Sequence, residues 1–217
     1  KELCKDILDV NVETLFKINV RDFFNKYGLS STDEIINIMK ELMIKYGYDP
    51  NITFREHMYM TDIMLRVPAL CLNNRELVFF SNISHPDTVI IDAIRASISI
   101  PLLFNAPIIK EQHYVDGGVI RHVPYDPYVG HEDKTLCIKL KHKQPYMEKI
   151  DTMQNFVIML MTSLHQSAND IPDEFKHLIE IDSEYSSTNF SINRQDMEKM
   201  MLIGVKDVQD WVMNPSE

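Results

Sequence analysis

The sequence predicts an α/β fold in which a mixed, partly parallel central sheet carries helices on both faces. Short apolar stretches that favour extended backbone alternate along the chain with longer segments of helical periodicity. The composition, with 45% hydrophobic and 25% charged residues, is that of an ordinary packed domain. The 217 residues contain no internal repeat and no evident linker, so we expect a single domain over residues 1–217.

The expected helices are defined by apolar residues at helical spacing and by residues that begin or end helices. Thr32 to Tyr46 is amphipathic, Ser31 or Thr32 can cap its start, and Gly47 ends it. A second helix, over 88–99, stops before Pro101. The remaining helical segments are a short one within 51–60, a long one from Ile150 to Gln166, and a terminal one from Asn193 to Met213.

The expected strands are short and rich in β-branched and aromatic residues. Two of them, 63–73 and 77–81, flank a tight turn at Asn74-Arg75 and therefore predict a hairpin. Two shorter stretches, Ile108-Ile109 and 113–115, flank the polar turn Lys110-Glu111-Gln112. Later strands are expected over Thr135–Lys141 and Leu178–Ile181.

The stretch Tyr114-Val115-Asp116-Gly117-Gly118 carries a carboxylate at the end of a predicted strand. Two glycines directly after it let the chain turn through positive φ and bring backbone close to another group. Residues at strand ends are often positioned for chemistry by the rigid scaffold beneath them. Asp116 is therefore a candidate catalytic residue, although these three residues taken alone favour an ordinary turn.

The sequence around this stretch resembles the patatin-like phospholipase family. The matching segments occur in the family's order, and they are Ala69–Asn73, Leu77–Ser81, Ala93–Phe104 and Tyr114–Val119. The resemblance covers most of the chain, and its most specific part is the block over 95–118. It implies a patatin-like three-layer α/β/α fold.

The resemblance also implies a lipid acyl hydrolase, a phospholipase or esterase, that uses a Ser–Asp dyad. On this resemblance Asp116 is the dyad carboxylate, and Gly117 and Gly118 set the turn that follows it. A serine hydroxyl is a weak nucleophile until a positioned base accepts its proton, and the carboxylate would be that base. His122 stands where the family usually has Asn, and an imidazole can still donate one hydrogen bond at that position.

The family's nucleophile motif has no match in this chain. Nowhere do the 217 residues contain Gly-x-Ser-x-Gly. The segment Gly28-Leu29-Ser30-Ser31 lacks the second glycine and is expected to be a loop leading to a helix cap. Residues 1–8 already show a helical pattern, and the first residue is Lys1 rather than Met. We therefore expect a domain that is incomplete at its N-terminus, with the serine on an upstream segment and no activity in this chain alone.

Two classes of function remain open at this point. The first is the acyl hydrolase, whose partners are a lipid or ester substrate and the missing N-terminal segment of the same domain. The second is a non-catalytic patatin-fold protein, used for binding or structure, that lacks the nucleophile. An upstream Gly-x-Ser-x-Gly in the complete protein separates the two classes.

Charge and composition restrict the partners further. A net charge of −10 argues against nucleic acid and against strong docking on anionic membranes. Any transient membrane contact would then use apolar surface. The run over 156–161 is the most apolar stretch, but it is too short for a span and is better explained as a buried helix.

We expect no cofactor and no metal, because His113 and His122 do not have the spacing of metal ligands. The odd number of cysteines, three in all, indicates a reducing compartment. The expected location is intracellular, either cytoplasmic or peripheral to a membrane.

Overall fold

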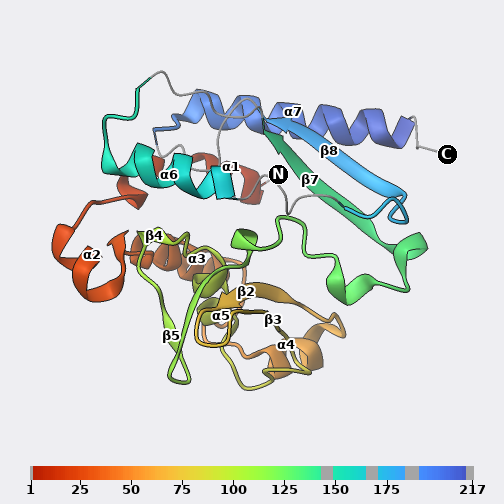
Figure 1. The fold of residues 1–217 in the computed structure, drawn as a ribbon. Helices are drawn as coiled ribbons and strands as arrows, with labels where there is room; N and C mark the ends of the chain where they lie inside the picture. The colour runs from red at the N-terminus through yellow and green to blue at the C-terminus, as the bar shows by residue number, and fades with distance from the viewer. Residues whose placement is uncertain (1, 143–148, 165–170, 184–190, 214–217) are drawn as a thin grey trace. The chain divides into compact units, whose positions relative to one another are not determined.

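The computed structural model describes residues 2–142, 149–164, 171–183 and 191–213. It has a mixed α/β fold with both parallel and antiparallel strand pairs, as the sequence predicts (Figure 1). The chain divides into two compact units, which are described separately. One unit comprises residues 15–121, and the other comprises residues 1–14 together with 122–217.

Most elements agree with the predicted segments, but the helix Val20–Lys26 and the strands Gly28–Ser30 and Leu102–Phe104 were not predicted. The α-helices are α1 (Glu2–Leu8), α2 (Val20–Lys26), α3 (Asp33–Lys45), α4 (Phe54–Thr61), α5 (Ile90–Ser97), α6 (Met153–Leu164) and α7 (Arg194–Met213). The strands are β1 (Gly28–Ser30), β2 (Val67–Cys71), β3 (Glu76–Phe80), β4 (Leu102–Phe104), β5 (Ile108–Ile109), β6 (Gln112–Asp116), β7 (Leu136–His142) and β8 (His177–Ser183). Short 3-10 helices include η2 (Gly117–Val119) directly after β6. The end of the predicted helix 150–166 lies outside the described residues.

An antiparallel sheet in the order β3-β2-β6-β5 forms the centre of the unit 15–121. Its two hairpins turn where the sequence places them. Arg75 adopts a positive φ of 63° between β2 and β3. The turn between β5 and β6 has two such residues, Lys110 (φ 48°) and Glu111 (φ 66°). Residues other than glycine rarely adopt this left-handed conformation, so both turns are held by the strands that they join.

Helix α5 packs on this sheet and builds the core. Its residues Ile90, Ala93 and Ala96 are buried in one cluster with Phe80 and Tyr114 of the sheet. The small side chains of the two alanines let the helix backbone approach the strands closely. Helix α4 is fixed beside this core by a capping box, in which Thr53 Oγ1 accepts the backbone N–H of Glu56 while the Glu56 side chain accepts the N–H of Thr53.

The segment 28–31 is not the expected loop. Gly28–Ser30 is strand β1, and it pairs in parallel with β4, which the sequence analysis did not predict. A Cβ on Gly28 would lie only 2.2 Å from the backbone carbon of Phe104. Only glycine permits this approach, and three residues are too few to show a strand periodicity.

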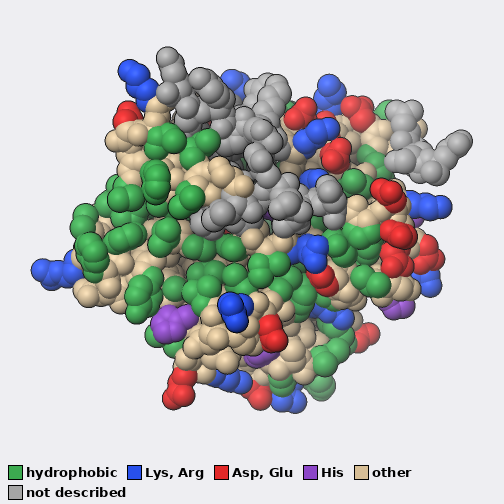
Figure 2. All heavy atoms as spheres, in the orientation of Figure 1, with side chains coloured by type: hydrophobic (Ala, Val, Ile, Leu, Met, Phe, Trp, Pro, Cys, Tyr) green, Lys and Arg blue, Asp and Glu red, His purple; other side chains and the backbone are tan. Residues whose placement is uncertain are grey.

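Helix α2 leads into β1 and presents an apolar face to solvent. Asn19 caps its start by accepting backbone N–H groups through its side chain. The residues Val20, Phe24 and Tyr27 follow one another at intervals of four and three and are 63%, 74% and 58% exposed. Figure 2 shows hydrophobic side chains gathered over α2, at the left of the view.

The other unit contains the parallel pair β7–β8, in register from Leu136 opposite His177 to His142 opposite Ser183. Helix α7 packs against β8, where the backbone N–H of Asp182 donates to the side chain of Asp207. In α6, Val157 is buried, but Phe156 and Leu160 are exposed, so the prediction of a buried helix holds only in part. No helix within the described ranges combines the length and the apolar character that crossing a bilayer requires.

Candidate active site around Asp116

Strand β6 delivers Asp116 to the edge of the unit's core, and two neighbours hold its backbone there. In the sheet it lies opposite Ala69 of β2. Its backbone N–H donates a 2.9 Å hydrogen bond to the carbonyl oxygen of Ser99, which follows α5. Ser99 is fully buried, and its hydroxyl donates to the Arg95 carbonyl at 2.7 Å. The position of Asp116 is therefore fixed by strand β2 and by the end of α5 together.

The Asp116 carboxylate caps the 3-10 helix that follows it. The backbone N–H of Gly118 donates to Oδ1 of Asp116 at 2.7 Å. A hydrogen bond from a helix N-terminus to a carboxylate is charge-assisted and therefore stronger than a bond between neutral groups. Asp116 is half-buried, so the carboxylate is oriented without being sealed from solvent.

Both glycines after Asp116 lie close to other groups, and neither has a positive φ. The sequence-based expectation of a positive φ is therefore wrong. A Cβ on Gly117 would meet the Pro68 carbonyl at 3.2 Å and the Leu77 side chain at 3.1 Å. A Cβ on Gly118 would lie 3.1 Å from Oδ1 of Asp116 itself. The expectation that the glycines bring backbone close to another group is confirmed.

Arg95 joins the end of α5 to the start of α3. Its guanidinium donates to Oδ1 of Asp33 at 2.6 Å and to the buried hydroxyl of Thr32 at 3.0 Å. The hydrogen bond from the Ser31 hydroxyl, followed by that from Arg95, lowers the pKa of Asp33 below its usual value. The segment that carries Ser99 is thus anchored to a second helix.

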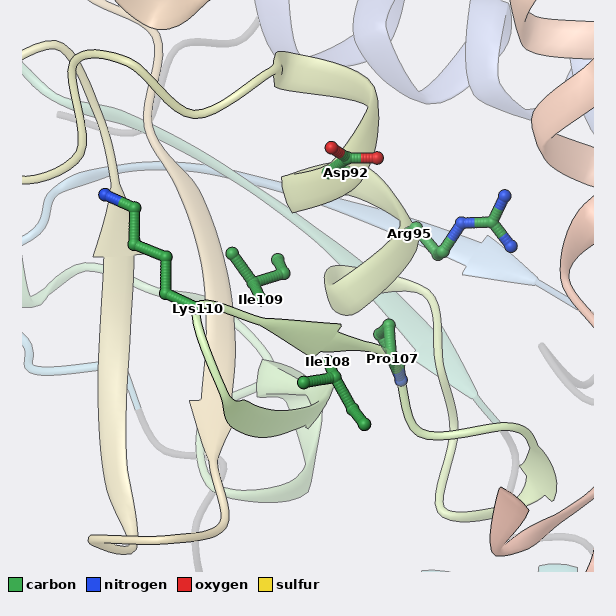
Figure 3. A pocket seen from close by; sticks show the side chains of 6 residues that line it. All are labelled: Asp92, Arg95, Pro107, Ile108, Ile109 and Lys110. Carbon is green, nitrogen blue, oxygen red and sulfur yellow. The ribbon is translucent and has the colours of Figure 1, made fainter. Parts of the chain in front are cut away.

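A cavity of about 460 Å³ lies between the end of α5 and the β5 hairpin. It is lined by Asp92 and Arg95 of α5 and by residues 107–110 of the β5 hairpin (Figure 3). Ile109 pairs with Gln112, the first residue of β6, and the Pro107 carbonyl accepts the N–H of Tyr114, two residues before Asp116. The charges that line the cavity are of both signs, and Arg95 is already bonded to α3.

His113, weighed above as a metal ligand, has ordinary structural contacts. Its backbone N–H donates to the side chain of Asn73 at 2.8 Å, and its ring contacts Tyr27 with centroids 5.9 Å apart. The sequence analysis missed the supporting roles of Ser99, Arg95 and Asp33. The segment over 93–104 could have pointed to the first two, because it precedes Asp116 in the matched order, but no pattern relates Arg95 to residue 33.

Comparisons with known proteins agree with the resemblance. The family model described as patatin-like phospholipase matches residues 1–129, a range that includes Asp116 and both glycines. "Probable lipid hydrolase 463L" of Invertebrate iridescent virus 6 is 25% identical over 189 residues, which cover 82% of this chain and 62% of that protein. The chain thus spans about three fifths of the length of this relative.

Two further similarities extend over nearly the whole chain. "Uncharacterized protein R571" of Acanthamoeba polyphaga mimivirus is 22% identical over 231 aligned positions, covering 98% of this chain and 75% of that protein. Among solved structures, VipD from Legionella pneumophila aligns with a TM-score of 0.42 and 14% identity, covering 95% of this chain and 45% of VipD.

Proposed function

Because the chain belongs to the patatin-like phospholipase family, we propose that it is the part of a lipid acyl hydrolase that carries the base of a Ser–Asp dyad. Asp116 is that base. The 217 residues contain no Gly-x-Ser-x-Gly. The proposal therefore requires a nucleophilic serine on another segment of the protein. The viral relative named as a probable lipid hydrolase supports the class of reaction.

The observation that carries this proposal is the hydrogen bond between the Gly118 N–H and Oδ1 of Asp116. It fixes the carboxylate at a strand end, with its backbone held by Ser99 and by β2. A general base has to be oriented toward the proton that it accepts, because misplacement by about 1 Å can cost roughly a hundredfold in rate. The same bond also occurs in ordinary Asx turns, so its catalytic interpretation rests on the match of the family model to residues 1–129.

The proposed reaction depends on proton transfers to and from the Asp116 carboxylate. Asp116 accepts the proton of the serine hydroxyl while the serine oxygen attacks the ester carbonyl carbon of the lipid. The carbon–oxygen bond to the alcohol breaks, and Asp116 returns the proton to the departing alkoxide, leaving an acyl-serine. Water then attacks the acyl carbon while Asp116 accepts one of its protons. The bond from this carbon to the serine oxygen breaks, Asp116 returns the proton to that oxygen, and the free fatty acid leaves. The dyad uses no metal and no cofactor in any of these steps.

A fluorophosphonate probe applied to the complete protein tests the proposal, because it labels only an activated serine. The informative variant is Asp116→Asn, since its Oδ1 can still accept the Gly118 N–H. We expect labelling to slow by about 10²–10⁴-fold, with an unchanged melting temperature.

Asp62→Asn is the matched control. Asp62 is an exposed residue with a φ of 54°, a conformation that Asn tolerates well. This variant should label at the rate of the unmodified protein. Equal labelling of the Asp116→Asn variant would remove Asp116 from the mechanism. A complete protein that never labels and has no Gly-x-Ser-x-Gly would support the non-catalytic alternative.

A further inference from the structure

One side of the unit 15–121 exposes a continuous set of apolar and aromatic side chains, which we call the α2 surface. It consists of Val20, Phe24, Tyr27, Ile108 and His113. All except the half-buried His113 are more than half exposed, and Phe24 reaches 74%. Contiguous exposed apolar groups of this kind mark interaction sites more often than isolated ones do.

Positions along the chain and one ring contact join these residues into one surface. Val20 and Phe24 lie four residues apart on one side of α2, and Tyr27 is the residue that caps its end, with a φ of 63°. The Tyr27 ring contacts the His113 ring, and His113 lies opposite Ile108 in the β5–β6 pairing. The surface therefore runs from helix α2 onto the edge strand of the central sheet (Figures 1 and 2).

Its charges differ from those of the rest of the chain. The segment 17–27 carries three basic side chains and one acidic one, in a protein whose net charge is −10. Lys17 pairs with Glu34 and Lys26 pairs with Asp22, which leaves Arg21 without an ion pair among the described residues. At the tip of the β5 hairpin, Lys110 and Glu111 cancel each other.

The combination of exposed aromatic rings and the Arg21 guanidinium suits an anionic lipid surface. Aromatic side chains favour the boundary between headgroups and acyl chains, and nearby cations gain from anionic headgroups. The apolar helix α6 offers a useful contrast. It also exposes apolar side chains, with Phe156 52% and Leu160 42% exposed, but its twelve residues include no charged side chain.

The strand geometry relates this surface to the candidate base. His113 precedes Asp116 by three residues on β6, so it lies about 10 Å away along the strand and its side chain is on the opposite face of the sheet. We propose that the α2 surface is the contact through which the protein docks on bilayers containing anionic lipid. This inference rests on the proposed function for its biological purpose, because a lipid hydrolase has to reach its substrate in the bilayer. The docking itself requires no catalysis.

The test is sedimentation of the complete protein with vesicles of 70% phosphatidylcholine and 30% phosphatidylserine. Phe24→Ser should weaken vesicle binding by roughly tenfold or more, because it removes a large apolar side chain from the lipid. Arg21→Gln should weaken it by about fivefold and should have no effect on vesicles of phosphatidylcholine alone. Both side chains are exposed, so both variants should keep the melting temperature of the unmodified protein.

Tyr59→Ser is the matched control, because Tyr59 of α4 is 92% exposed and lies outside the α2 surface. It should bind vesicles normally. In addition, Phe24→Trp should give new fluorescence that brominated lipids quench, whereas Tyr59→Trp should not.

Three outcomes would overturn the proposal: equal binding of the Phe24→Ser and Tyr59→Ser variants, absence of vesicle binding by the unmodified protein, or self-association that depends on Phe24. Vesicle binding and probe labelling are measured independently. A protein that binds through Phe24 but never labels would retain this surface and lose the proposed catalysis. A protein that labels but does not bind vesicles through Phe24 would retain the proposed catalysis and lose this surface.

Discussion

The carbonyl oxygen of Ser99 accepts the backbone N–H of Asp116 at 2.9 Å, and this one bond joins the two most family-like segments of the chain. Ser99 lies in the matched segment over 93–104, just after helix α5, and Asp116 begins the turn that contains the two glycines. The candidate base is therefore supported by a helix end that is itself tied to α3 through Arg95 and Asp33. The predictions below test the parts of this arrangement separately.

Replacing Gly117 with alanine and replacing Gly118 with alanine should have different effects. In Gly117→Ala the new methyl group meets the Pro68 backbone, which cannot move easily, so we expect a loss of about 1–3 kcal/mol in the free energy of unfolding. In Gly118→Ala the methyl group meets the Asp116 carboxylate, which can rotate away. We expect this variant to unfold normally and to label with fluorophosphonate roughly tenfold more slowly or worse. Urea unfolding and labelling of the complete protein distinguish the two, and identical profiles would contradict the separate roles assigned here.

Gly28→Ala should be among the most destabilising substitutions in the chain. The added Cβ would sit 2.2–2.3 Å from backbone atoms of residues 104 and 105, so β1 and β4 must separate. We expect a cost of more than about 3 kcal/mol, or failure to fold, measured by urea unfolding or by soluble yield. Gly204→Ala is the control, because nothing lies within 4 Å of its Cβ in the middle of α7. This second variant should be more stable by roughly 0.5–1 kcal/mol, and a loss of stability there would contradict the helix.

The ion pair of Asp33 with Arg95 predicts a pH-dependent contribution to stability. Hydrogen bonds from Ser31 and Arg95 lower the pKa of Asp33 in the folded chain, so the folded state favours the charged carboxylate. The stabilisation is then present above the unfolded pKa of about 3.9 and is lost as the pH falls through the lower, folded pKa. Because Asp33 is largely exposed, Asp33→Asn should cost only about 0.5–1 kcal/mol at pH 7. Unfolding measured at pH 7 and below pH 4 should show the difference between the two proteins shrinking, and a constant difference would exclude the ion pair as its cause.

The three cysteines should differ sharply in reactivity. Cys4 is exposed, whereas Cys71 and Cys137 are buried, and burial raises the pKa of the Cys137 thiol. Only the thiolate is nucleophilic, so iodoacetamide at pH 8 should modify Cys4 first. Peptide mass spectrometry of the native complete protein should find the other two modified only after denaturant is added. Early alkylation of Cys71 would indicate that the sheet around β2 opens readily.

Local patterns predicted most of the elements. The amphipathic helix over 32–46, the hairpin turning at Asn74-Arg75 and the short hairpin before Asp116 all form, because each depends on periodicity and turn residues that are close in sequence.

The structural features that the sequence did not reveal depend on contacts between residues far apart in the chain. The parallel pair β1–β4 joins two three-residue strands that lie more than seventy positions apart, and neither shows a periodicity of its own. At the candidate site, the sequence located Asp116 at a strand end, but the acceptor of its N–H and the donor to its carboxylate are set by tertiary packing. The role of Asp116 as base stays a prediction until the labelling experiment is done.

The parallel pairing of β1 with β4 also bears on the order in which the unit 15–121 forms. The β2–β3 and β5–β6 hairpins close over only a few residues, whereas β1–β4 closes a loop of about 70 residues. That difference in loop length costs about 2–3 kcal/mol in chain entropy, so the hairpins should assemble first and the parallel pair last. Contacts formed after the transition state govern how fast a protein unfolds. Gly28, which lets β1 approach β4, would therefore affect the rate of unfolding far more than the rate of folding.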